Sequence, residues 1–128
     1  LKIYMQDSGL FVAMLEQGSS AALLNGDFGM YKGAIYENII ADAFSKMNRP
    51  LYYYHKESGL EIDFITKYQN NAVLVEVKAT NGNTKSANTI LKNKEQYNVN
   101  LCIKYGDCNV GQEKEKLALP YYMAFMLE

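Results

Sequence analysis

Residues 60–78, which read LEIDFITKYQNNAVLVEVK, constrain the fold of this chain more than any other stretch. Apolar and polar residues alternate on both sides of a polar centre at residues 68–71, a pattern that predicts two strands joined as a hairpin. Because side chains alternate between the faces of a strand, each strand should have one apolar face and one charged face. The apolar faces are expected to hold Leu60, Ile62 and Phe64 in the first strand and Val73, Val75 and Val77 in the second.

The register of this hairpin places two carboxylates opposite each other. A two-residue loop and a four-residue loop around Gln69 give the same pairing, in which Asp63 faces Glu76 and Glu61 faces Lys78. Directly opposed Cβ atoms lie roughly 4.5–5.5 Å apart, and like charges at that distance are destabilising. Lys78 would offset part of this repulsion, and Mg²⁺, which one or two carboxylates commonly hold, would offset more. The alternative is an ordinary solvated face of charged residues.

Size and composition favour a single soluble domain. The chain has 128 residues, 48% of them apolar and 21% charged, which is typical of a globular protein. A formal net charge of −1 excludes a uniformly basic nucleic-acid binder but leaves room for a local basic patch. No run of about 18 apolar residues is present, so we expect no membrane span. Cys102 and Cys108, without a visible secretory signal, favour reduced thiols and a cytoplasmic location. The first residue, Leu1, indicates a piece of a longer protein.

The rest of the chain is predicted to alternate helices with strands. Helices are expected at residues 8–18, 21–24, 33–47, 87–97 and 121–127, and further strands at residues 51–56 and 99–105. Loops are expected at residues 25–29, 80–85 and 106–112, and residues 113–119 have no clear assignment. A strand, helix and strand between residues 74 and 105 favour a parallel crossover. The predicted fold class is therefore α/β, a mixed β-sheet flanked by helices.

Glu37 lies within the predicted helix 33–47, and its side of that helix is apolar. Ile40, Ala41 and Phe44 follow it by three, four and seven residues, so its carboxylate lies in or beside the apolar stripe. Two interpretations stay open. Glu37 either contributes an acid to a site or is a helix-start glutamate that the helix dipole favours.

Together, Glu37, Asp63 and the tripeptide Glu76-Val77-Lys78 resemble the active-site pattern of the PD-(D/E)xK nuclease superfamily. Five stretches resemble, more closely, an uncharacterised C-terminal domain that follows the ATPase module in a group of prokaryotic AAA-type ATPases. These stretches are KIYMQDSGL from Lys2, GAIYENII from Gly33, LYYYHKESGLEIDFI from Leu51, LVEVKAT from Leu74 and LALPYYMAFML from Leu117. One departure from the superfamily name is Ile62, which stands where the motif has proline.

The resemblance implies a restriction-endonuclease-like core at residues 33–128, with an N-terminal helical extension at residues 1–32 packed on it. It implies catalytic roles for Asp63, Glu76 and Lys78, and a Mg²⁺ or Mn²⁺ site made by Glu37, Asp63 and Glu76. The implied activity is phosphodiester hydrolysis in DNA, next to an upstream ATPase module of the same chain. The alternative is a non-catalytic protein-interaction or regulatory module that keeps the nuclease fold. Three lysines around the predicted helix 87–97 either contact substrate or form a solvated helix face, namely Lys85, Lys92 and Lys94.

Overall fold

The computed structural model describes residues 1–15, 19–27, 29–80 and 83–127. Its helices are α1 (Ser8–Ala13), α2 (Ser19–Leu24), α3 (Lys32–Lys46), α4 (Lys85–Lys92) and α5 (Lys94–Tyr97), with the 3₁₀ helices η1 (Gly29–Tyr31) and η2 (Tyr121–Met126). Its strands are β1 (Tyr52–His55), β2 (Glu61–Tyr68), β3 (Asn71–Val77), β4 (Cys102–Gly106), β5 (Gly111–Glu113) and β6 (Lys116–Pro120). The predicted loops 25–29 and 80–85 each include residues outside this described set.

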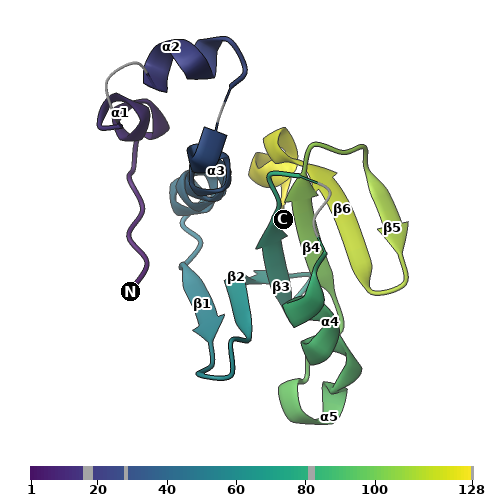
Figure 1. Cartoon of the computed structure of the whole chain (residues 1–128). Helices are drawn as coiled ribbons and strands as arrows, with labels where there is room; N and C mark the ends of the chain where they lie inside the picture. The colour runs from purple at the N-terminus through teal and green to yellow at the C-terminus, as the bar shows by residue number, and fades with distance from the viewer. Residues whose placement is uncertain (16–18, 28, 81–82, 128) are drawn as a thin grey trace.

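The six strands form one mixed sheet in the order β1-β2-β3-β4-β6-β5 (Figure 1). The first three strands are antiparallel neighbours, whereas β4 runs parallel to β3, and β6 runs parallel to β4. The short β5 pairs antiparallel with β6 at the far edge of the sheet. The predicted parallel crossover is confirmed, because the connection from β3 to β4 contains α4 and α5.

Two buried cores lie on opposite faces of this sheet, and each is covered by helices. The α3-side core packs α3 and η2 against the sheet and contains Ile40, Phe44, Phe64, Val73, Val75, Ile103, Tyr105 and Leu119. The α4-side core packs α4 against the other face and contains Ile62, Leu74, Ala87, Ile90, Leu91, Val99 and Cys102. Each fully buried Ile, Leu or Phe side chain stabilises the fold by roughly 1.5–3 kcal/mol. The expected mixed sheet flanked by helices is confirmed.

The predicted register of the β2–β3 hairpin is confirmed over the paired part of the two strands, whereas the predicted pairs Asp63–Glu76 and Glu61–Lys78 lie beyond the last pair of the backbone ladder. Phe64 pairs with Val75, and the pairing continues to Tyr68 and Asn71, which flank a two-residue loop. The two loop residues, Gln69 and Asn70, both have positive φ angles, 48° and 64°. Positive φ at both central residues is the conformation of a type I′ turn, whose twist matches that of the flanking strands.

One prediction about the faces of β2 is wrong, because this strand carries a bulge. Tyr52 and Tyr54 of β1 are two residues apart, whereas their partners Ile65 and Ile62 are three residues apart. The extra residue rotates the strand, so that Ile62 lies in the α4-side core and Phe64 in the α3-side core. Asp63 therefore lies where the strand changes which face its side chains occupy.

Other differences concern the ends of elements. Asp7 accepts a hydrogen bond from the Leu10 N–H group and caps α1, which ends at Ala13; the predicted end near residue 18 lies outside the described residues. The predicted helix 87–97 is interrupted at Asn93, whose φ of −116° and ψ of 61° are not helical. The predicted loop 106–112 overlaps β5, and the predicted final helix is the 3₁₀ helix η2. Within the described part of the chain, no helix combines the length and apolarity needed to cross a membrane.

Candidate functional site

A pocket of about 280 Å³ opens where the β2–β3 hairpin meets the beginning of α4. Three of the four predicted site residues line it, namely Asp63, Glu76 and Lys78. Glu61 lines it as well, with Asn83, Lys85 and Ser86 from the chain that leads into α4. The Ser86 hydroxyl accepts a hydrogen bond from the Glu61 backbone N–H group at 3.3 Å, which ties α4 to β2 beside the pocket.

Asp63 lies at the point where the hairpin ladder ends. The backbone pairing of β2 with β3 reaches Phe64 and Val75, and beyond it the Val77 N–H group donates to Asp63 Oδ2 at 2.8 Å. A side chain therefore satisfies a backbone donor that the ladder leaves without a strand partner. Burial raises the pKa of Asp63 above its ordinary value. The Val77 hydrogen bond opposes this shift, and the charge of Glu37 adds to it.

Glu76 is the most deeply buried acid of the pocket, with a side chain that is 4% exposed. Its Oε2 atom lies 2.7 Å from the Lys78 ammonium group, but its Oε1 atom is buried without a hydrogen-bond partner among the described residues. Burial raises the pKa of Glu76, and the nearby charge of Asp63 raises it further. An unsatisfied carboxylate oxygen away from water is costly, so this atom marks a place where a proton, a water molecule or a cation would be stabilising.

Lys78 directly follows β3 and is held firmly by its backbone. Its N–H group donates to the Tyr105 carbonyl at 2.9 Å, and its own carbonyl accepts a hydrogen bond from the Tyr121 hydroxyl group. Burial would lower the pKa of the Lys78 ammonium group, but the hydrogen bond and the charge of Glu76 outweigh this effect and raise it. Lys78 is therefore positively charged at neutral pH, with its charge directed into the pocket.

Glu37 does not line this pocket. It is the sixth residue of α3, and no acid lies in the first turn of that helix, so the interpretation based on the helix dipole is wrong. Its Oε1 atom accepts hydrogen bonds from the Lys2 ammonium group, at 2.9 Å, and from the Tyr4 hydroxyl group. Glu37 thus contacts the N-terminal segment on the α3 side of the sheet.

Sequence reasoning missed Lys2, which lies among three carboxylates. Its ammonium nitrogen is 2.9 Å from Glu37 Oε1, 2.9 Å from Glu61 Oε1 and 3.5 Å from Asp63 Oδ1. Burial would lower the pKa of Lys2, but the hydrogen bonds to Glu37 and Glu61 raise it, and the hydrogen bond from Lys2 lowers the pKa of Glu61. Lys2 lies 35 positions before Glu37 in the sequence, so no local sequence pattern predicts their contact.

The donor set fits a hard divalent cation at Asp63 and Glu76. Carboxylate oxygens are the ligands that Mg²⁺ and Mn²⁺ prefer, and the orphaned Glu76 Oε1 atom belongs to the same pocket as Asp63. As the side chains stand, however, no group of three or more His, Cys, Asp or Glu residues in the described part of the chain could hold a metal ion. Two carboxylates with water to complete the coordination are compatible with Mg²⁺, which usually keeps several waters.

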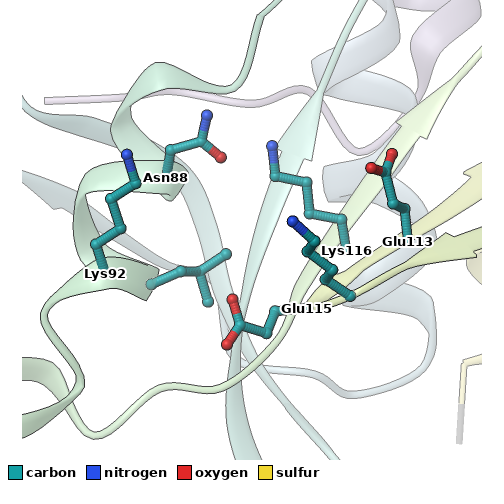
Figure 2. A pocket seen from close by; sticks show the side chains of 7 residues that line it. Asn88, Lys92, Glu113, Glu115 and Lys116 are labelled. Atoms are coloured by element: carbon teal, nitrogen blue, oxygen red, sulfur yellow. The ribbon is translucent and has the colours of Figure 1, made fainter.

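Two further cavities of mixed charge lie against the β5–β6 hairpin. A cavity of about 510 Å³ shares Asn83 with the carboxylate pocket and is also lined by Lys104 and Lys116. A further cavity of about 360 Å³ lies between α4 and the β5–β6 hairpin, and Lys92, Lys116, Glu113 and Glu115 are among the residues that line it (Figure 2).

The structure separates the three lysines that were predicted to contact substrate or solvent. Lys85 lines the carboxylate pocket, and Lys92 lines the cavity beside β5 and β6. Lys94 forms an ion pair with Glu115.

The fold and the pocket define an α/β domain with a mixed six-stranded sheet and an acidic pocket at one end of its hairpin. The model of one family, described as a domain of unknown function (DUF4143), matches residues 32–123. This match covers well over half of the chain, so the chain belongs to the DUF4143 family. No match was found among curated proteins or among solved structures.

Proposed function

We propose that this domain is a divalent-metal-dependent phosphodiester hydrolase of the PD-(D/E)xK type, which acts on DNA and follows an AAA-type ATPase module. The observation that carries the proposal is the buried Glu76 carboxylate, whose Oε1 atom has no hydrogen-bond partner in the described structure and which shares a pocket with Asp63 and Lys78. Burial raises the pKa values of Asp63 and Glu76, and carboxylates with shifted pKa values in a pocket are candidates for functional groups.

The order of elements supports the superfamily assignment. The core that the resemblance implies is a helix, three antiparallel strands, a helix and a further strand. The chain has α3, then β1, β2 and β3, then α4 and α5, then β4, in that order. Asp63 on β2 and the Glu76-Val77-Lys78 tripeptide, at and just after the end of β3, are the residues that the resemblance assigns to the motif. The association with an upstream ATPase rests on the five matching sequence stretches alone.

Asp63 and Glu76 would hold the Mg²⁺ or Mn²⁺ ion. When bound, the ion would supply positive charge toward the scissile phosphate and make a nearby water more acidic. Lys78, charged and directed into the pocket by its contact with Glu76, would bind a phosphate oxygen and stabilise the charge that develops there. The contact with Glu76 raises the pKa of Lys78, which favours the charged ammonium form and a role as a hydrogen-bond donor. Glu37 is not in this proposed ligand pair, because Lys2 and Tyr4 engage its Oε1 atom.

The test is a cleavage screen over single- and double-stranded DNA and RNA in the presence of Mg²⁺ or Mn²⁺. Wild-type protein should cleave one of these forms, and EDTA should abolish the activity. Asp63→Asn, Glu76→Gln and Lys78→Gln should each reduce the rate by about 100-fold or more, the usual cost of removing a group that stabilises transition-state charge. Glu95→Gln on the exposed face of α5 is the matched control and should cleave at the wild-type rate. Cleavage that survives Asp63→Asn would show that the pocket is not the active site.

A non-catalytic interaction module is the second candidate, and the surface of the N-terminal extension favours it. Large apolar side chains are exposed over residues 1–30, namely Leu1, Ile3, Leu10, Met14, Leu24 and Met30. Exposed apolar side chains that gather on one part of a protein are typical of protein-binding surfaces. A pull-down with the ATPase module tests this candidate. Binding that is lost in a Leu24→Ser/Met30→Ser variant would support it, and absence of binding by the wild-type domain would exclude it.

A further inference from the structure

The N-terminal segment 1–5 directs alternate side chains toward the acids of α3 and β2. Lys2 and Tyr4 contact Glu37, whereas Leu1 and Ile3 are exposed. Alternation of this kind is typical of an extended segment lying on a surface. Figure 1 shows the segment running as an extended stretch before α1.

Two contacts fix the position of this segment. The Met5 N–H group donates to Asn38 Oδ1 at 2.8 Å, and Asn38 Nδ2 donates back to the Met5 carbonyl at 3.1 Å. The Tyr4 ring packs on Phe64 of β2 with ring centroids 5.4 Å apart. Asn38 and Phe64 are both buried, so these contacts anchor Tyr4 and Met5 to the body of the fold, while Lys2 contacts carboxylates through its ammonium group.

Both oxygens of Asp63 are engaged while the segment is in place. Oδ2 accepts the Val77 hydrogen bond, and Oδ1 lies 3.5 Å from the Lys2 ammonium nitrogen. A divalent cation at Asp63 would therefore share its ligand with a fixed positive charge. Two cations at such a distance repel strongly, by several kcal/mol near a protein surface, so Lys2 and a metal ion cannot both approach Asp63 closely.

We propose that segment 1–5 is a latch, in which Lys2 occupies the place of a cation at Asp63 and a divalent metal ion binds fully when the segment moves aside. This inference rests on the proposed metal site. Among the described residues, no group of three or more His, Cys, Asp or Glu side chains is arranged to hold a metal ion. The latch accounts for this, because Glu37, Glu61 and Asp63 are arranged around the Lys2 ammonium group instead. Release of the segment would leave these carboxylates without their cation and favour metal uptake.

The test is a calorimetric titration of Mn²⁺ into the wild-type chain and its Lys2 variants. Lys2→Gln should bind Mn²⁺ about tenfold more tightly, which corresponds to about 1.4 kcal/mol. Lys2→Arg, which keeps the charge, should bind like the wild type. Lys46→Gln is the charge-matched control, because Lys46 pairs with Asp42 at 2.6 Å on α3 outside the carboxylate pocket, and it should also bind like the wild type.

A second measurement uses the unmodified chain and does not depend on how the variants fold. Hydrogen exchange at residues 2–5 is followed with and without Mn²⁺, and the latch predicts that Mn²⁺ accelerates exchange there, above all at the Met5 N–H group. Unchanged or slower exchange would overturn the latch. Equal Mn²⁺ affinity in the wild type and Lys2→Gln, lost in both when Asp63→Asn is added, would overturn the latch and leave the metal site standing. No Mn²⁺ binding by any variant would overturn both.

Discussion

Two groups of carboxylates meet at the open end of the β2–β3 hairpin, and different lysines neutralise them. On one side Glu37 and Glu61 share the ammonium group of Lys2. On the other side Glu76 is paired with Lys78 through one oxygen, while its second oxygen has no hydrogen-bond partner in the described structure. Asp63 belongs to both groups, since one of its oxygens faces Lys2 and the other accepts the Val77 N–H group.

The difference between the two groups is one of burial. The Glu61 side chain is 49% exposed, so water can solvate the part of its carboxylate that Lys2 does not contact. The Glu76 side chain is 4% exposed, so its charge depends on protein groups for stabilisation. Side chains with the same carboxylate group therefore play different parts. Glu37 and Glu61 anchor a chain segment, and Glu76 keeps a carboxylate oxygen without a hydrogen-bond partner in the described structure.

The largest expected effect on stability is at Lys78. Lys78→Met leaves the buried Glu76 carboxylate without its cation and should lower the free energy of unfolding by about 3 kcal/mol at neutral pH, the lower end of the range for a broken buried pair. Urea denaturation measures this loss. In a Glu76→Gln background the same substitution should cost much less, because no buried charge remains to be neutralised. Equal losses in both backgrounds would mean that Lys78 acts through packing.

A smaller effect is expected at Lys2, whose partners are better solvated. Lys2→Met should lower the free energy of unfolding by about 1.5 kcal/mol, the scale of a charge-assisted hydrogen bond, and the loss should shrink in high salt. The exposed pair of Lys46 with Asp42 gives the lower limit of the comparison, and Lys46→Met should cost about 0.3–0.5 kcal/mol. If Lys2→Met cost no more than Lys46→Met, the N-terminal segment would not be anchored by its charge.

The third effect is a pH dependence of the pocket acids. Burial raises the pKa values of Asp63 and Glu76 above their ordinary values of 3.8 and 4.5, so the folded state holds protons that the unfolded state releases. The stabilisation from these protons is fully present below the ordinary pKa values and is lost as the pH rises through the raised ones. Glu76→Gln should therefore gain stability relative to wild type as the pH rises from about 4 toward 7. A stability difference that does not change with pH would contradict the raised pKa of Glu76.

The central part of the fold could be predicted from the sequence because its information is local. Alternation and the loop around Gln69 set the register in which Phe64 pairs with Val75, and the apolar face of residues 33–47 predicts α3. The same register brings Asp63 near Glu76 and Lys78, three residues that line one pocket. Their roles as ligands and catalytic groups stay predictions.

The remaining features depend on contacts between distant segments. The bulge in β2 is seen in its pairing with β1, and no residue type in the strand predicts it. The β5 strand consists of Gly111, Gln112 and Glu113, which are all exposed and carry no apolar alternation, so it forms because β6 is there to pair with it. Lys2 reaches Glu37 across 35 positions in the sequence, and only the folded chain shows that contact.

The most direct test of the central claim is the Mn²⁺ affinity of the wild-type chain compared with an Asp63→Asn/Glu76→Gln variant, measured by calorimetry. These substitutions keep the shape of both side chains and remove the two charges that face the pocket. The proposed site predicts that the wild type binds Mn²⁺ and that the double variant, with a melting temperature no lower than that of the wild type, does not. Binding that persists in the double variant, or that is absent in the wild type and in Lys2→Gln alike, would contradict the proposed metal site.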